Sequence, residues 1–480
     1  MWKTIAEKEL RDHLQSTRFL VAAGVSTILI VMSVWLGIAH YKARAAQYEQ
    51  AVQMMLDLAS QQTNWMTVSM SAYRKPSPAE IFSNGVNSDI GRYSAISQWG
   101  EVRLVRSEYS EDPMMAAFQF LDPMFVVLIV LSLIAILFTY NAVNGEKESG
   151  TLKLVFANNV SRSEYIVGKL IGSWLVILTP VIISFLIGAL LLILTGVGLS
   201  AGHWGQYVMF VIASVLYATC FMLLGVFVSA LTHRTSVSFL ILLVVWICSV
   251  LIIPKAATML AGQAIPVPTV DEIESRVNSF STQTRTEFFT NMGKRSRERF
   301  QSAKDMKPED RQQVLAAYMK ETEELRKEMD KTIAANNARV YEDYYNQKNR
   351  QEMLAFSLAK ISPASQFQLV TMKLSGTDVA LKKRYEDAMK EYKAQYSTFS
   401  QQKGGMFGFR VSSSRGSSSA SMIGPEEKKV DISEAPKFGD PEYSFSTALE
   451  GSLFDLGLLA LFNILAFVGA FVAFLRFDMR

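Results

Sequence analysis

The residue types that usually carry catalysis or bind metals form no recognisable pattern in this sequence. The four histidines are scattered along the chain, so their spacing predicts no metal site. Cys220 and Cys248 both fall inside long hydrophobic runs, where we expect them to pack as small apolar residues rather than to form a disulfide. The sequence has no Gly-x-x-x-x-Gly-Lys-Ser/Thr phosphate loop, so this chain is not expected to hydrolyse ATP. We therefore predict no catalytic residue, no metal and no cofactor in this chain.

Residues 140–169 are instead dense in charged, small and apolar side chains at an informative spacing. Gly150 can end one helix, and residues 151–157 would then make about two turns of a short helix. The apolar side of this helix would carry Leu152, Val155 and Phe156. Ser161 and Glu164 fit a Ser-x-x-Glu capping box, which starts the next helix. The pattern predicts a short amphipathic helix between two membrane spans, able to transmit force from a soluble partner, or an ordinary interfacial turn.

The elements that must position this segment are membrane helices. The chain has 480 residues, of which 50% are hydrophobic and 19% are charged. A bilayer core needs about 20 apolar residues per helix, so uncharged runs of that length are diagnostic. Six runs contain no Asp, Glu, Lys or Arg: residues 19–39, 124–143, 170–199, 206–231, 236–253 and 456–475. A soluble protein does not need six such runs, so we predict an all-α polytopic membrane protein with six transmembrane helices.

The distribution of Lys and Arg predicts the orientation. These residues precede the first run, occupy the connection at 144–169 and follow the last run, whereas the short loop at 200–205 has none. By the positive-inside rule both termini are cytoplasmic, with residues 476–480 as a short tail. The first run is too long for a cleavable signal, so we interpret it as an uncleaved anchor. We expect a multi-pass protein of the bacterial cytoplasmic (inner) membrane.

This orientation predicts two long extracytoplasmic segments, residues 40–123 and residues 254–455. Charges three and four residues apart indicate exposed helices over residues 307–350 and 379–400. Residues 92–109 alternate weakly and predict short strands, and the Gly- and Ser-rich residues 403–424 predict a loop. The outer part is therefore expected to be large and mostly α-helical, with minor β structure. It could bind cargo, bind a partner protein or act as a spacer.

The Glu-x-Glu-x-Gly-Thr-Leu run, followed by Val-Ser-Arg and Gly-Lys, resembles the cytoplasmic loop of ABC-2 type permeases. In that family the loop forms a coupling helix that sits in a cleft of the ATP-binding subunit. Position by position, the matching residues are Glu146, Glu148, Gly150, Thr151, Leu152, Val160, Ser161, Arg162, Gly168 and Lys169. Asn159 stands where the family usually has proline. With Val155 and Phe156 on the apolar side, these residues are the predicted ATPase-coupling segment.

The resemblance covers most of the chain in outline, including residues 8–11, 75–85 and 253–254. Within the family, the chain resembles members that carry a large insertion before the last helix. Residues 1–18 would form an amphipathic elbow helix on the cytoplasmic leaflet, beside the ATPase. Its predicted key residues are Trp2, Ile5, Leu10 and Arg11. Polar residues that could line a path for an amphiphilic substrate are Thr139, Tyr140, Asn141 and Thr219.

The resemblance implies the permease subunit of an ATP-driven transporter, with export as the usual direction. Two copies of a separate ATP-binding subunit would hold ATP and Mg, and two permease chains would form a homodimer or a heterodimer in contact with membrane lipid. No nucleic acid is expected. The uncharged spans also count against ion coupling, which normally needs an ionisable residue in the membrane. The alternatives are a membrane-anchored scaffold, or an ABC-driven protein that transmits force to an extracytoplasmic partner.

Overall fold

The computed structural model describes residues 1–62, 65, 68–96, 102–111, 114, 121–158, 160–302, 308–404 and 429–476. The chain divides into two compact units, Met1–Val250 with Ser362–Arg480, and Leu251–Ile361. Within the described residues, six helical stretches are long and apolar enough to cross a membrane: Thr17–Ser60, Pro123–Glu148, Arg162–Leu194, Ala201–Leu231, Thr235–Ala264 and Phe445–Leu475. The predicted all-α polytopic membrane fold is confirmed. The predicted loop at 403–424 and the predicted tail at 476–480 lie outside the described residues, except for residues 403, 404 and 476.

The membrane bundle belongs to the first unit. Its elements are α1 (Trp2–Leu14), α2 (Thr17–Ser60), α5 (Pro123–Val126), the π-helical turn η2 (Val127–Leu131), α6 (Ser132–Thr139), α7 (Asn144–Glu148), α8 (Thr151–Ala157), α9 (Arg162–Leu194), α10 (Ala201–Leu231), α11 (Thr235–Ile247) and α17 (Phe445–Leu475). Serine caps start four of the long helices, each accepting a hydrogen bond from a backbone N–H three residues on: Ser16, Ser161, Ser200 and Ser444. Local sequence therefore defines where these membrane helices begin.

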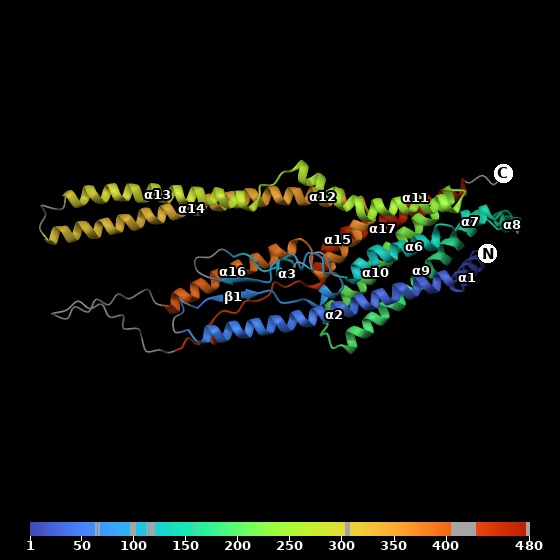
Figure 1. The fold of residues 1–480 in the computed structure, drawn as a ribbon, viewed down its shortest axis with the longest axis horizontal. Coiled ribbons are helices and arrows are strands. Elements are labelled where there is room, and N and C mark those ends of the chain that lie inside the picture. Colours follow the sequence, from blue (N-terminus) through green and yellow to red (C-terminus); the bar gives the residue numbers. More distant parts are fainter. Residues whose placement is uncertain are drawn as a thin grey trace. The chain divides into compact units, whose positions relative to one another are not determined.

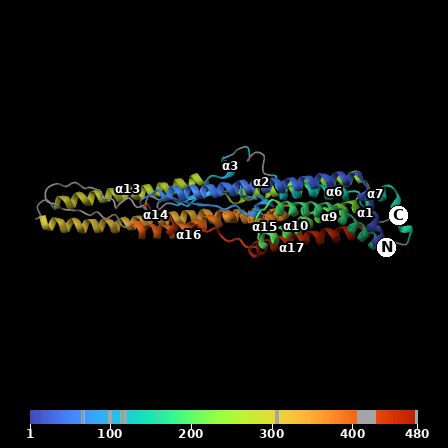
Figure 2. The ribbon, with the colours of Figure 1, turned by 90° about the horizontal axis from the view of Figure 1, so that it is seen from below.

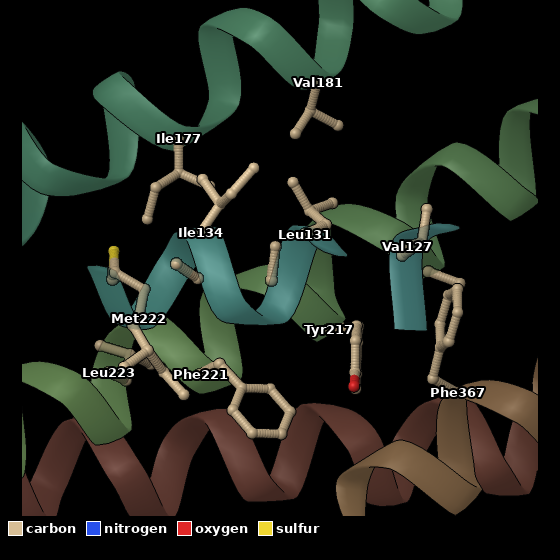
Figure 3. Packing of buried hydrophobic residues seen from close by; sticks show 14 of the residues in the cluster. Val127, Leu131, Ile134, Ile177, Val181, Tyr217, Phe221, Met222, Leu223 and Phe367 are labelled. Carbon is tan, nitrogen blue, oxygen red and sulfur yellow. The ribbon is translucent and has the colours of Figure 1, made fainter. Parts of the chain in front are cut away.

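The core of the bundle is apolar and close-packed. In Figure 3, Leu131 and Ile134 point toward Ile177 of α9, while Tyr217 of α10 lies on their other side. The Tyr217 ring stacks on Phe367 with centroids 4.7 Å apart. Because lipid tails are as apolar as these side chains, close van der Waals packing rather than removal from water holds α6, α9 and α10 together in this layer.

Irregular backbone inside the bundle is satisfied by neighbouring side chains. In the π-helical turn η2, the carbonyl of Leu128 accepts hydrogen bonds from the Tyr217 hydroxyl (2.9 Å) and from the Ser132 hydroxyl (2.7 Å). Ser132 in turn accepts a bond from the indole N–H of Trp246 at 2.8 Å. An unmet carbonyl in a membrane would cost several kcal/mol, so these bonds allow the irregular turn to exist.

A short helix returns to this bundle from the long segment before the last span. Helix α15 (Pro363–Ser375) begins at Ser362, whose side chain accepts from the Ala364 N–H, and Pro363 occupies its first turn. Gln366 and Phe367 are fully buried, and Figure 2 shows α15 beside α10 and α17. The segment predicted as one outer domain, residues 254–455, therefore contributes to both units.

A small outer module completes the first unit. Its elements are β1 (Met70–Tyr73), η1 (Pro78–Ile81), β2 (Tyr93–Ile96), α3 (Glu108–Glu111), α16 (Ala380–Gly404), η4 (Ile432–Glu434) and the second half of α2. The two strands pair antiparallel, from Met70 opposite Ile96 to Tyr73 opposite Tyr93. Tyrosines of α16 and the last turns of α2 share an apolar cluster with the strands. The predicted minor β structure is thus a single two-stranded ribbon within the described residues.

The second unit is a helical hairpin. It consists of α12 (Ile253–Ala264), α13 (Val270–Ser302) and α14 (Pro308–Ala359), reached from α11 through the π-helical turn η3 (Cys248–Ile252). Helices α13 and α14 lie side by side in Figure 1. Ile273, Val277 and Ile333 are buried along their contact, and Arg295 and Arg299 both pair with Glu321. These ion pairs are exposed and worth little, so the narrow apolar contact holds the hairpin.

Candidate functional site

The connection between the second and third spans forms a compact platform at one end of the bundle. Helices α1, α7 and α8 lie at this end together with the N-terminus (Figure 1). Gly150 separates α7 from α8 and adopts a left-handed conformation, with φ 75°, which glycine enters without steric cost. The prediction that Gly150 ends one helix and that residues 151–157 form the next is confirmed.

A buried ion cluster ties this platform together. The Lys169 ammonium lies 2.6 Å from Glu9 Oε1 and 2.7 Å from Glu146 Oε1. The Tyr165 hydroxyl donates a 2.6 Å hydrogen bond to Glu146 Oε2. The Lys169 side chain is only 5% exposed and that of Glu9 only 9%. We name these four residues the Lys169 cluster; because buried charges are tolerated only when paired, the cluster joins α1, α7 and α9.

Two glycines allow α1 to approach α9 closely enough to form this cluster. A Cβ at Gly168 would lie 2.8 Å from Ile5 Cβ and from the Trp2 carbonyl. A Cβ at Gly172 would lie 2.6 Å from Glu9 Cβ. Small residues four apart on one helix let a second helix pack directly against its backbone, as they do here. Of the elbow residues predicted from the sequence, Ile5 and Leu10 pack on the core, whereas Trp2 and Arg11 are exposed.

Helix α7 also bonds to the end of α10 and to the connection between α10 and α11. Glu148 Oε2 accepts hydrogen bonds from the Thr235 N–H (3.1 Å) and hydroxyl (2.9 Å), so it caps the start of α11. Lys147 donates to the Ala230 carbonyl, and Asn144 Nδ2 donates to Thr232 Oγ1 at 2.9 Å. Glu146 and Glu148, both predicted coupling residues, therefore make contacts within this chain.

Helix α8 has an inner and an outer face. Leu152 is buried, and Val155 and Phe156 pack on the bundle. The Phe156 ring lies 5.5 Å from that of Tyr165, which stacks on Phe474 at 5.0 Å. The apolar side predicted for this helix is thus its inner face.

The outer face of α8 carries Thr151, Lys153 and Leu154, which we call the α8 tip. Leu154 is 67% exposed although it is apolar. Leu154 was not predicted from the sequence. The signal that could have identified it is an apolar side chain at a position that does not belong to the inner face of the helix. Glu9, a carboxylate on the apolar stripe of α1, and Tyr165 were not predicted either.

The remaining predicted coupling residues connect helix ends. Ser161 Oγ accepts from the Glu164 N–H at 3.3 Å, which is one of the two bonds of the predicted capping box, and the Glu164 carboxylate accepts from the Ser161 hydroxyl at 3.0 Å. Arg162 Nη1 donates to the Leu475 carbonyl at 2.8 Å, at the end of α17. Asn159, the position where the family usually has proline, lies outside the described residues.

Of the four predicted path residues, Thr139, Tyr140 and Asn141 follow one another at the end of α6, and Thr219 lies on α10. Thr139 donates to the Ala135 carbonyl at 2.7 Å and packs against Gly225. Thr219 accepts from the Trp174 indole at 3.0 Å, and Tyr140 accepts from Arg18 at 3.4 Å. Asn141 lies against the backbone of Gly145. Bonds of this kind are typical of helix packing, and the assignment of these residues to a path stays a prediction.

An apolar cavity of about 680 Å³ lies instead between α2, the η2–α6 segment and α11. Its lining includes Val21, Val25, Leu133, Leu137, Phe239 and Leu243. Thr17 and Arg18 also line it. A cavity of this size and polarity suits the apolar part of an amphiphile.

Comparison with known proteins decides the family. The sequence profile of a family described as "ABC-2 family transporter protein" matches residues 3–477. This chain belongs to the ABC-2 transporter family. It is therefore a multi-pass membrane component of a transporter, and the resemblance found in the sequence is confirmed.

A curated relative resembles this ABC-2 chain over a shorter stretch than the family profile does. The chain is similar to a protein of Stutzerimonas stutzeri named "Probable ABC transporter permease protein NosY", with 32% identity over 125 residues. That match covers 26% of this chain and 45% of the relative, so the chain spans less than half the length of the relative it matches.

Proposed function

We propose that this ABC-2 chain is the permease subunit of an ATP-driven exporter in the bacterial inner membrane, with both termini cytoplasmic. It works with two copies of a separate ATP-binding subunit, which hold ATP and Mg, and with a second permease chain, identical or sister. One observation carries the proposal: the Lys169 cluster joins α1, α7 and α9 into one body beneath an exposed α8 tip. A rigid platform with an exposed apolar knob suits docking to a soluble partner.

Force would then pass inward along contacts that are already formed. When the paired ATPase subunits close on ATP, they push the α8 tip toward the bilayer. The push passes from Phe156 through Tyr165 to Phe474 at the end of α17. The Lys169 cluster passes it to α9 and to the elbow helix α1. The apolar cavity between α2, α6 and α11 supports an amphiphilic cargo.

Substituting Leu154 tests this docking proposal. The chain is co-expressed with the candidate ATPases of its organism, isolated in mild detergent, and scored for bound ATPase. We expect Leu154→Asp to lower ATPase recovery about tenfold, because the substitution places a charge in an apolar contact. A tenfold loss of affinity corresponds to about 1.4 kcal/mol of binding free energy. Its thermal unfolding temperature should not change, since Leu154 is exposed in the free chain.

The matched control is Leu58→Asp, which changes an equally exposed leucine on the outer half of α2. Undiminished recovery with Leu154→Asp, or equal loss with Leu58→Asp, would refute docking at the α8 tip. Glu146→Lys is a poorer probe, because it places a second ammonium against Lys169 and disturbs folding together with docking.

A second candidate, force transmission to an outer partner, is favoured by helix α2. It runs unbroken for 44 residues, about 66 Å, from the platform to the outer module. Two contacts clamp its outer half: the ion pair of Arg44 with Glu80 at 3.0 Å, and His40 Nε2 beside Glu108 Oε1 at 3.3 Å. ATP-dependent movement of an amphiphile into inverted vesicles would support export. An ATP-dependent change of the outer module without cargo movement would support force transmission.

The clamp at Glu108 should make the stability of the outer module depend on pH. Burial by itself raises the pKa of Glu108, but the hydrogen bond and charge of His40, the hydrogen bond from Ser88 and the charge of Arg44 lower this pKa to about 2. A carboxyl with a folded-state pKa below its ordinary value of 4.5 stabilises the fold above pH 4.5 and loses that contribution as the pH falls toward 2.

We therefore expect Glu108→Gln to lower the unfolding temperature at pH 5, and by less at each step below about pH 4.5. Thermal unfolding in detergent across this range measures the difference. Glu111→Gln, on the same short helix and more exposed, is the control and should show little effect. A Glu108→Gln difference that persists unchanged to pH 3 would contradict the clamp.

A further inference from the structure

A second groove lies between the ends of α10 and α17, at the platform end of the bundle. Its volume is about 850 Å³. Its apolar lining includes Phe227, Leu231, Leu465, Val468, Val472 and Ala473. Leu231 and Leu465 are well exposed, so on membrane helices they face the lipid and the groove opens sideways into the bilayer. The groove does not share lining residues with the cavity between α2, α6 and α11.

Small residues of α10 and α17 keep this groove open. A Cβ at Gly469 would lie 3.3 Å from two ring carbons of Phe227, so the glycine allows that ring to lie against the α17 backbone. Ala230 and Ala473 line the groove without filling it. The free length along the two helices suits an acyl chain, which needs no hydrogen-bonding partner.

Basic residues surround the platform end of this groove. His233 and Arg476 line it and are exposed. Arg162 Nη1 bonds to the Leu475 carbonyl, which brings a second guanidinium within one residue of Arg476. None of the described residues that line the groove is acidic.

We propose that this groove binds an anionic phospholipid, with an acyl chain along α10 and α17 and the phosphate at Arg476 and Arg162. Guanidinium groups bind phosphate oxygens through charge-assisted hydrogen bonds. Basic pockets between membrane helices on the cytoplasmic side are suited to anionic lipid headgroups. The inference rests on the orientation in the proposed function, which puts this end of the bundle in the cytoplasmic leaflet.

The bound lipid would brace the platform. Phe474, two residues before Arg476, stacks on Tyr165 of the Lys169 cluster. A lipid that fills the groove and neutralises Arg476 holds the end of α17 against α9. The content of anionic lipid in the membrane would therefore determine how stably the end of α17 is held against α9 in the coupling platform.

Native mass spectrometry of the purified full chain tests the site. The chain is mixed with phosphatidylglycerol or with phosphatidylcholine, which share acyl chains and differ in net charge. We expect phosphatidylglycerol to be retained in preference. Arg476→Gln should lower its retention about fivefold, the effect of one charge near a lipid headgroup, and should leave phosphatidylcholine unchanged. Ala473→Phe, which fills the groove, should lower the retention of both lipids.

The control is Arg106→Gln, which removes an exposed guanidinium from the outer module. Equal retention of the two lipids by the native chain would overturn the proposal, as would full phosphatidylglycerol retention by Arg476→Gln. The readout needs no ATPase, so its failure leaves the docking test standing. The orientation is checked separately: a thiol introduced by Arg476→Cys should react with an impermeant reagent only from the cytoplasmic side. Reaction from the outside alone would remove both the orientation and this lipid assignment.

Discussion

Replacing Lys169 with methionine should destabilise the chain by about 3–5 kcal/mol, the usual cost of removing one partner from a buried ion pair. Methionine keeps most of the volume of lysine but leaves Glu9 and Glu146 facing each other without their cation. The two carboxylates are 9% and 17% exposed, so water cannot replace the lost ammonium fully. Thermal unfolding of the purified chain in detergent, followed by loss of the monodisperse gel-filtration peak, measures the change.

The control for this substitution is Lys153→Met, which removes an exposed lysine from the α8 tip and should leave the unfolding temperature nearly unchanged. A combined variant, Glu9→Gln with Glu146→Gln and Lys169→Met, should recover much of the loss because no unpaired charge remains buried. If Lys169→Met unfolds at the native temperature, the Lys169 cluster does not hold the platform, and the proposed route of force through it fails.

Replacing Gly172 with leucine should detach the elbow helix. The new Cβ would start 2.6 Å from Glu9 Cβ, and the rest of the side chain would need the space that α1 occupies. Overpacking of this kind costs about 1–3 kcal/mol, and here it also pulls Glu9 away from Lys169. We expect the rate of amide hydrogen exchange across residues 2–14 to rise at least to the rate of an isolated short helix, because such a helix is barely stable in water.

Gly24→Leu is the matched control. Gly24 lies on membrane helix α2 with no atom within 4 Å of its would-be Cβ, so the larger side chain has room. Exchange in α1 should stay slow in this control. Slow exchange in Gly172→Leu as well would mean that α1 is held by something other than its close approach to α9. ATPase recovery measured on the same two variants shows whether the elbow helix takes part in docking.

Much of the fold was predictable because a bilayer imposes strict local requirements. A backbone in hydrocarbon must satisfy its own hydrogen bonds, so each span has to be a long uncharged helix, and such helices are visible in composition alone. Helix ends were visible too, since Gly150 and Ser161 act through their own conformation and short-range bonds. The fold class, the short α8 helix and the ABC-2 family followed from these features and from the motif around them.

The candidate site was only half predictable. Glu146 and Lys169 were identified from the resemblance, but as docking residues rather than as partners of each other. Leu152 was correctly placed on the apolar side of α8, whereas Leu154 went unnoticed because a two-turn helix gives too few positions for periodicity to separate its faces. The path residues were chosen because they are polar. A polar residue in a membrane helix more often makes a local hydrogen bond than lines a substrate path.

The sequence by itself determined that this protein is a bundle of membrane helices with a short connecting helix between its second and third spans. Tertiary structure alone decided that Glu9 meets Lys169 across 160 positions, that Gly168 and Gly172 admit the elbow helix, and that α15 returns into the bundle. The physical reason is that an apolar sequence makes a helix stable in the bilayer but does not determine which neighbouring helix it contacts there. That choice depends on the packing of whole surfaces and on the pairing of a few buried charges, which no local pattern records.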